Sequence, residues 1–240
     1  MKRRLHVPAA QLARGNPVEL TVSQARYLET VLRLAPGAEV EVFDGEGRRF
    51  EAKLEPSALR IGDELPRAFA SSVDVWLAQA IVKGDKLDFV TQKATELGVS
   101  RILLFDSARS VVKLDDRRAG SRVERLRRVA EEAARQCGRS DVPLIDGPSS
   151  LDMIVDRLEP DRVALLLDPE ESDLRLSQAA RGASRLCLVV GPEGGFGQEE
   201  FERAVTGGMV PVSLGPLVLR TETAGLAALA VVRHLAGELG

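Results

Sequence analysis

Two short runs of the chain contain only apolar residues. Residues 163–167 read Val-Ala-Leu-Leu-Leu, and residues 186–190 read Leu-Cys-Leu-Val-Val. A strand that is apolar at every position is buried on both faces, which is typical of a parallel sheet covered by helices. The two runs therefore predict an α/β fold built around a parallel sheet.

The pattern around these runs supports the same fold. Strands are predicted at residues 73–81, 101–105, 142–145, 163–167, 186–190 and 210–214, and helices at 86–97, 117–136, 149–158, 175–180, 199–205 and 221–235. Strands that alternate with helices in this way form a parallel sheet with the helices on its faces.

Residues 1–70 have a different texture. Short apolar or alternating runs at 17–22, 39–43 and 49–54 are separated by turn signals, among them Pro36-Gly37 and residues 61–63. One helix is predicted at 23–34, with Ser23 as its N-cap. This texture indicates a small antiparallel barrel, so two domains are expected, at residues 1–70 and 71–240.

Composition excludes several classes of protein. The longest uncharged apolar stretch, residues 223–232, is half as long as the ~20 residues of a membrane-spanning helix. The first residues are not followed by the apolar segment of a secretory signal, which makes the cytoplasm the default location. Two cysteines 50 positions apart and two histidines predict neither a disulfide scaffold nor a metal site.

Charge is unevenly distributed along the chain. Residues 109–139 hold ten Arg or Lys and five Asp or Glu, whereas residues 140–240 hold eight basic and sixteen acidic residues. The basic segment is a candidate for steering a polyanion such as RNA. A solvated helix face with local ion pairs explains it equally well.

Glycine-rich and irregular loops follow three of the predicted strands. Residues 189–196 lead from a buried strand into the glycine-rich loop Gly191-Pro192-Glu193-Gly194-Gly195. This loop matches neither of the two common phosphate-binding patterns. The Glu193 carboxylate would also repel the negative charge of a pyrophosphate. Loops at 166–170 and 214–224 follow two other strands. If the loops converge, they form a cleft for an adenosine-type ligand, and the alternative is that the glycines only form a tight turn.

Several segments resemble a known family. Lys83-Gly84-Asp85-Lys86 and residues 92–99, 132–136, 191–196 and 214–224 are similar, in this order, to the bacterial 16S ribosomal RNA uridine N3-methyltransferases of the RsmE type, in the SPOUT superfamily. Residues 31–33 and 43–47 fit the small PUA-like barrel of that family. A histidine that often precedes the Val-Leu-Arg of the barrel is missing from residues 24–27.

The resemblance implies a PUA-like β-barrel domain for RNA binding, followed by a SPOUT methyltransferase domain whose parallel sheet contains a deep trefoil knot. It implies S-adenosyl-L-methionine as the methyl donor, a homodimer, and N3 of a uridine in the decoding region of 16S rRNA in the small ribosomal subunit as the target. The knot is implied by the family alone, since unrelated parallel α/β chains are almost always unknotted.

The resemblance and the loops together give candidate site residues. Arg220 and Glu222 are the candidate catalytic residues, Glu222 as a base and Arg220 as a stabiliser of developing charge. Residues expected to bind the cofactor are Leu166, Leu167, Val190, Gly191, Pro192, Glu193, Gly194, Gly195, Leu214, Gly215, Leu217, Leu219, Thr221, Thr223 and Ala224. Residues expected to bind RNA are Arg3, Arg4, Arg33, Lys83, Lys86, Lys93, Arg135 and Arg139.

Two other functions remain as alternatives. In a non-catalytic ribosomal RNA-binding or assembly factor, the basic helix and the barrel would hold RNA and the glycine loops would only turn the chain. A dinucleotide-dependent oxidoreductase is disfavoured, because the glycine fingerprint is missing and Glu193 stands in the loop. Cofactor binding separates the methyltransferase from the RNA-binding factor.

Overall fold

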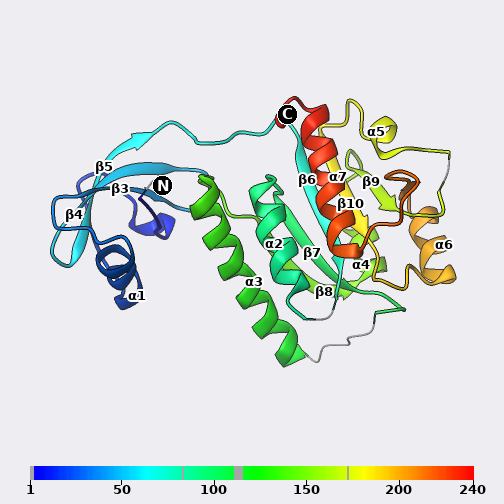
Figure 1. Cartoon of the computed structure of the whole chain (residues 1–240), viewed down its shortest axis with the longest axis horizontal. Coiled ribbons are helices and arrows are strands. Elements are labelled where there is room, and N and C mark those ends of the chain that lie inside the picture. The colour runs from blue at the N-terminus through cyan, green and yellow to red at the C-terminus, as the bar shows by residue number, and fades with distance from the viewer. Residues whose placement is uncertain (1–2, 83, 111–115, 172) are drawn as a thin grey trace. The chain divides into compact units, whose positions relative to one another are not determined.

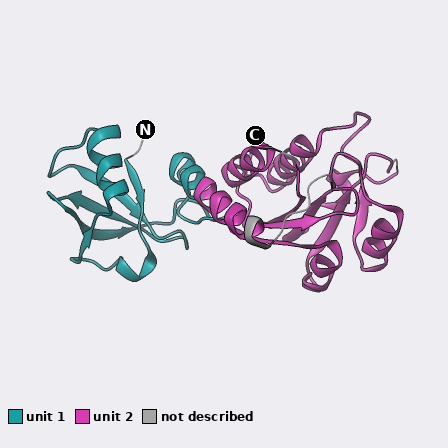
Figure 2. Cartoon of the chain, turned by 90° about the horizontal axis from the view of Figure 1, so that it is seen from below, with its two compact units in different colours: residues 1–70, 131–142 teal, residues 71–130, 143–240 magenta. Residues whose placement is uncertain are grey.

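A computed structural model describes residues 3–82, 84–110, 116–171 and 173–240 (Figure 1). The chain forms two compact units (Figure 2). The small unit contains residues 1–70 and 131–142, and the large unit contains residues 71–130 and 143–240. The sequence assigns residues 131–142 to the second domain, so the structure differs there.

Hydrogen bonds explain why residues 131–142 group with the small unit. The Ser140 hydroxyl donates to the carbonyl of Gly47 (2.8 Å), and an Arg4 guanidinium N–H donates to the carbonyl of Ala134 (3.2 Å). A boundary drawn at one point of the sequence cannot show that a distant segment returns to the barrel.

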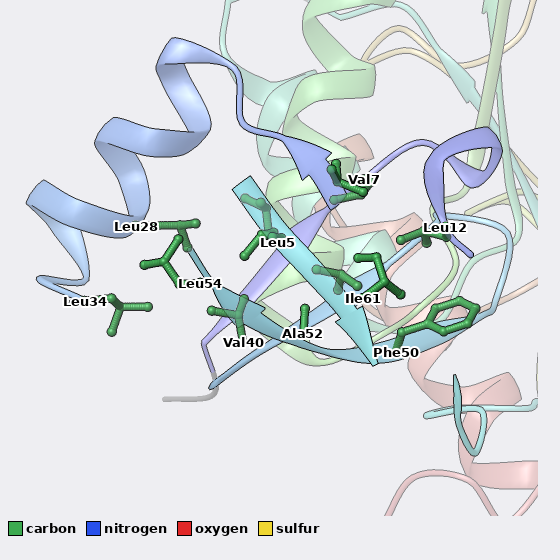
Figure 3. Close-up of a cluster of buried hydrophobic side chains, with 13 residues drawn as sticks. Leu5, Val7, Leu12, Leu28, Leu34, Val40, Phe50, Ala52, Leu54 and Ile61 are labelled. Atoms are coloured by element: carbon green, nitrogen blue, oxygen red, sulfur yellow. The ribbon is translucent and has the colours of Figure 1, made fainter. Parts of the chain in front are cut away.

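A five-stranded sheet forms the small unit. Its strands are β1 (Arg4–His6), β2 (Pro17–Glu19), β3 (Glu39–Phe43), β4 (Arg49–Leu54) and β5 (Ala58–Leu65), in the order β1-β3-β4-β5-β2. All neighbours are antiparallel except β1 and β3. Short helices lie at η1 (Ala9–Gln11), α1 (Val22–Arg26) and η2 (Tyr27–Val31). Inward side chains such as Val40, Phe50 and Ile61 pack with Leu28 into an apolar core (Figure 3).

Strands β3 and β4 have the predicted bounds, but two details of the small unit differ. The turn predicted at Gly62 is wrong, because Gly62 lies inside β5, where a Cβ would come within 3.2 Å of the Glu51 carbonyl oxygen on β4. The helix predicted at 23–34 is α-helical only in α1. Its N-cap is Thr21 instead of Ser23, because the Thr21 hydroxyl accepts a hydrogen bond from a backbone N–H (3.3 Å).

A six-stranded parallel sheet forms the large unit. Its strands are β6 (Asp74–Ala80), β7 (Arg101–Asp106), β8 (Leu144–Ser150), β9 (Val163–Leu167), β10 (Arg185–Val190) and β11 (Val210–Val212), in the order β11-β9-β10-β6-β7-β8. Every pair of neighbours is parallel, as the apolar runs predict. The helices are α2 (Lys86–Glu96), α3 (Asp116–Cys137), α4 (Leu151–Asp156), α5 (Leu176–Ala179), α6 (Gln198–Thr206) and α7 (Thr221–Leu235).

Helices cover both faces of this sheet. On one face α7 packs on β6 and β10 and against α2 and α5 (Figure 1). On the other face α4 packs on β7 and β8 and against α6. Alternate residues of each strand face the two layers: Ala78 and Cys187 contribute to the core under α4 and α6, whereas Leu77 and Val190 lie against Gly225 of α7.

Most predicted elements of the large unit are present, and β9 and α7 have the predicted bounds. The strand predicted at 142–145 is displaced, since β8 continues to Ser150. Glycine and proline usually interrupt a strand, but Gly147 and Pro148 lie inside β8, at the point where the pairing register of β8 with β7 is irregular. None of the helices described is long and apolar enough to cross a membrane.

A buried arginine closes the large unit at the end of α7. Arg233 is 3% exposed, and its guanidinium donates to the carbonyls of Leu97 and Val73, each at 3.0 Å. It also pairs with Glu238 at 2.8 Å. Burial favours a raised pKa for Glu238, but hydrogen bonds from Ser72, Ser71 and Arg233 outweigh it and lower the pKa below its usual value. The stability contributed by this carboxylate is therefore present at neutral pH and is lost as pH falls through the lowered pKa.

Replacing Arg233 by Met tests how much this group stabilises the fold. The substitution removes the cationic partner of Glu238 and the donor to the carbonyl of Leu97, so the free energy of unfolding should fall by about 3–5 kcal/mol. Urea denaturation measures it. The exposed Arg181 gives a matched variant, Arg181→Met, which should change the value by less than about 0.5 kcal/mol. Equal effects of the two substitutions on the free energy of unfolding would contradict the stabilising role assigned to Arg233.

Candidate active site

One pocket lies at the carboxyl ends of β9 and β10, the edge of a parallel sheet where ligands bind. Its volume is about 700 Å³. The loops after β7, β9 and β10 and the segment that leads into α7 supply its walls. The lining residues are Arg109, Leu167, Asp168, Pro169, Glu170, Val190, Gly191, Pro192, Glu193, Gly194, Gly195, Phe196, Gln198, Phe201, Val218, Leu219, Arg220, Thr221 and Ala224.

Ten of the residues that the sequence assigns to cofactor binding line this pocket: Leu167, Val190, Gly191, Pro192, Glu193, Gly194, Gly195, Leu219, Thr221 and Ala224. Arg220 also lines it, at the N-cap of α7. The three loops therefore converge in the large unit, so the condition that the sequence analysis sets for a ligand-binding cleft is met.

Five residues expected at the cofactor do not line the pocket. Leu166 is fully buried in the core on the α4 side of the sheet, because successive residues of β9 face opposite layers. Leu217 and Thr223 are exposed to solvent, and Leu214 and Gly215 lie outside the lining. The loop before α7 is irregular, so the sequence cannot show which of its residues turn inward.

A buried hydroxyl connects the glycine loop to α7. Thr221, the first residue of α7, donates a hydrogen bond to the carbonyl of Gly191 (2.6 Å) and accepts one from the side-chain amide of Gln79 (3.0 Å). Gln79 lies on β6 and is fully buried. These bonds fix the start of α7 against the loop after β10 and against the middle of the sheet.

The glycines of the loop have different structural requirements. Gly195 has a φ of +70°, which a residue with a side chain rarely adopts. At Gly191 a Cβ would lie 3.0 Å from the ring of Phe196. Gly194 has neither constraint, since its nearest contact would be the Cβ of Arg109 at 3.6 Å.

Charged groups at the pocket form a small network. The Lys86 ammonium lies 2.9 Å from a carboxylate oxygen of Glu193 and 3.3 Å from one of Glu222. Hydrogen bonds to these carboxylates raise the pKa of Lys86, that to Glu193 most strongly. Glu222 is therefore beside the pocket, although it does not line it. Lys86 is engaged with carboxylates in the structure, in contrast to its expected role in RNA binding.

Sequence reasoning missed several residues that shape the site. Arg109 lines the pocket and donates to the carbonyl of Gly194 (3.0 Å). Glu200 is buried and accepts hydrogen bonds from the Ser107 hydroxyl (2.7 Å) and the Gly197 N–H (3.2 Å), which fixes the start of α6. The sequence does offer a signal for Glu200: a glutamate at the third position of a helix often accepts a hydrogen bond from the backbone N–H of the N-cap residue. Gln79 and Arg109 have no comparable local signal.

Two of the expected RNA contacts are buried within the small unit. Arg4 is 2% exposed and pairs with Glu41 at 2.8 Å, and Arg139 is 5% exposed and pairs with Asp141 at 2.7 Å. This corrects the prediction for both residues: their guanidinium groups stabilise the small unit and are not presented to a phosphate.

The other residues expected to bind RNA vary in exposure. Arg3 and Arg33 are exposed, whereas Lys93 pairs with Glu96 at 2.8 Å. Arg135 stacks on the Tyr27 ring at 3.7 Å and pairs with Glu132. Lys83 lies outside the described residues.

Ion pairs also reduce the effective charge of the basic segment. Arg125 lies 3.1 Å from Asp85 and 2.5 Å from Asp88, and Arg127 lies 2.6 Å from Glu124. Arg128 is exposed and has no charged partner among the described residues. Arg127–Glu124 is a local pair within α3, as the alternative interpretation of a solvated helix face expects, whereas the Arg125 pairs join α3 to the start of α2.

Comparison with known proteins gives the family. A profile of the RNA methyltransferase domain matches residues 70–233, and a profile of the RNA methyltransferase PUA domain matches residues 20–58. Ribosomal RNA small subunit methyltransferase E of Bacillus subtilis is 34% identical to the chain over 93% of its length and 92% of the relative. The chain belongs to the ribosomal RNA small subunit methyltransferase E family. The predicted RsmE-type family is thereby confirmed.

Solved structures agree with this family. The methyltransferase E from Neisseria gonorrhoeae, bound to S-adenosyl methionine, is 31% identical with a TM-score of 0.90, and the alignment covers 98% of both chains. A methyltransferase from Legionella pneumophila in complex with the same cofactor is 32% identical, with the same TM-score and coverage. The PUA-like small unit and the α/β methyltransferase domain expected from the sequence are confirmed.

Proposed function

We propose that this member of the methyltransferase E family transfers a methyl group from S-adenosyl-L-methionine to small-subunit ribosomal RNA. The observation that carries the proposal is the pocket itself, which three strand-end loops form in a domain shared with relatives that bind this cofactor. In the RsmE-type family that the sequence resembles, the acceptor is N3 of a uridine in 16S rRNA.

The residues of the pocket fit S-adenosylmethionine. A volume of about 700 Å³ is within the range of cofactor pockets. Leu167, Val190 and Ala224 give apolar walls that suit an adenine ring, and Gly191 and Gly195 have no side chain that would cover the main-chain groups of the loop. Asp168, Glu170 and Glu193 add acceptors for hydroxyl and amino groups.

The bound cofactor supplies a methyl group on a positively charged sulfur, and the chain's own residues position the acceptor. Holding two reactants in a near-attack arrangement contributes roughly 7–11 kcal/mol, so a site without a strong nucleophile is sufficient. We infer that Arg220, which is exposed at the pocket, stabilises charge on a uracil carbonyl or phosphate. Glu222 is the candidate acceptor of the N3 proton, and Lys86 holds its carboxylate at the edge of the pocket.

The proposal includes assembly and location. Part of α7 stays accessible in the single chain, since Leu226, Ala227, Ala230 and Val231 are only half-buried. We infer that this surface contributes to the homodimer expected from the family, and that the enzyme modifies the small subunit in the cytoplasm.

A methylation assay tests the reaction. The protein is incubated with labelled S-adenosylmethionine and with small subunits from a strain that lacks the enzyme, and the modified base is mapped. Label at N3 of one uridine in 16S rRNA is expected. RNA binding without cofactor binding or label would instead indicate the non-catalytic RNA-binding factor.

Arg220→Ala tests the proposed role of this residue. Because a preorganised charge at the reacting group typically contributes about 10²–10³-fold to turnover, a loss of that order is expected while cofactor affinity stays within about three-fold. Single-turnover methylation and calorimetry measure the two quantities. Arg181→Ala removes an exposed arginine elsewhere in the large unit and should retain full turnover. Unchanged turnover in Arg220→Ala would exclude the role.

The glycine loop gives a second prediction about the cofactor. Placing a Cβ at positive φ costs roughly 1–2 kcal/mol. The free loop of Gly195→Ala should relieve this strain by leaving the conformation that forms the pocket, and binding must restore that conformation, so S-adenosylmethionine affinity should fall about 5- to 30-fold. Gly194→Ala makes the same chemical change without that strain and should weaken binding much less. Calorimetry of the two variants compares them, and equal losses would show that backbone strain is not the cause.

A further inference from the structure

Lys86 occupies an unfavourable position for a cation. It is the first residue of α2, and the N-terminus of a helix carries partial positive charge. The acidic residues of its own helix end do not neutralise it, because Asp85 and Asp88 pair with Arg125. Neither the helix dipole nor the charges at the start of α2 therefore explain the presence of a lysine at this position.

Two carboxylates from elsewhere in the large unit surround the Lys86 ammonium. Glu193 belongs to the glycine loop after β10 and lies 2.9 Å away, and Glu222 belongs to the first turn of α7 and lies 3.3 Å away. Glu222 is 15% exposed, and among the described residues Lys86 is its only cationic partner. One ammonium thus bridges two segments that are 29 residues apart in the sequence.

The same two segments are also joined by the hydrogen bond from Thr221 to Gly191. The Thr221 bond holds the inner end of the glycine loop, and Lys86 holds the loop two residues further on, at Glu193. Without the ammonium, the exposed carboxylate of Glu193 and the half-buried carboxylate of Glu222, which both lie within 3.3 Å of it, would repel each other. The loop would then move away from α7, and the pocket wall formed by residues 191–195 would move with it.

We propose that Lys86 is a positioning residue that acts as an ionic clasp: it holds the glycine loop against the first turn of α7 and so keeps the cofactor pocket closed on that side. This proposal rests on the proposed function only in taking S-adenosylmethionine as the ligand of the pocket. It replaces the expectation that Lys86 contacts an RNA phosphate.

Hydrogen exchange of the ligand-free protein tests the clasp without reference to activity. The backbone amides of Gly195 and Gly197 are hydrogen-bonded, to the Pro192 carbonyl and to Glu200, and should exchange at least about ten-fold faster in Lys86→Met than in the parent, because the loop opens more often. Lys53→Met, an exposed lysine of the small unit, should leave this exchange unchanged. Unchanged exchange in Lys86→Met would overturn the proposal.

Calorimetry with S-adenosylmethionine gives the second readout. Lys86→Met should bind at least ten-fold more weakly, Lys86→Arg should stay within about three-fold of the parent, and adding Glu193→Gln to Lys86→Met should regain affinity because the repulsion is relieved. A different result would overturn the clasp and show that Lys86 contacts an RNA phosphate. In that case Lys86→Met would keep the parent's cofactor affinity but bind RNA more weakly, and the slope of log K against log salt concentration for RNA binding would be reduced by about one. If the parent itself bound no cofactor, the proposed function would fail, and the exchange experiment would still decide the clasp.

Discussion

The hydroxyl of Thr221 is the interaction on which the pocket depends. It donates to the carbonyl of Gly191 and accepts from the amide of Gln79, so that one buried group links β6, the loop after β10 and the start of α7. A buried polar group that loses its partner costs about 1–3 kcal/mol, which makes this arrangement specific. The pocket walls, the place of Arg220 and the approach of Glu222 to Lys86 all follow from where α7 begins.

The parts of this arrangement that local patterns encode are visible in the sequence. Strand β9 is apolar at every position and α7 begins after a loop, and both have the predicted bounds. The ends of β9 and β10 meet at one edge because parallel strands place their carboxyl ends together. The sequence therefore locates the site and most of its glycine loop.

Other features depend on contacts between distant residues. The sequence pattern assigns Gln79 only to a strand. Its structural role is a hydrogen bond to Thr221, which is 142 positions away in the sequence. Arg4 and Arg139 have the chemistry of RNA contacts, but burial turns them into structural groups of the small unit. The return of residues 131–142 to the barrel is likewise invisible locally. The trefoil knot remains an expectation from the family resemblance.

The most direct measurement compares two threonines in the same turn of α7. Thr221→Val keeps the shape of the side chain but removes the bridging hydroxyl, and Thr223→Val makes the same change at an exposed position. If the Thr221 bonds set the pocket, calorimetry should show S-adenosylmethionine affinity reduced at least ten-fold in Thr221→Val and within about two-fold of the parent in Thr223→Val, a difference of about 1 kcal/mol or more. Equal affinities in the two variants, with both proteins folded, would contradict this role for Thr221.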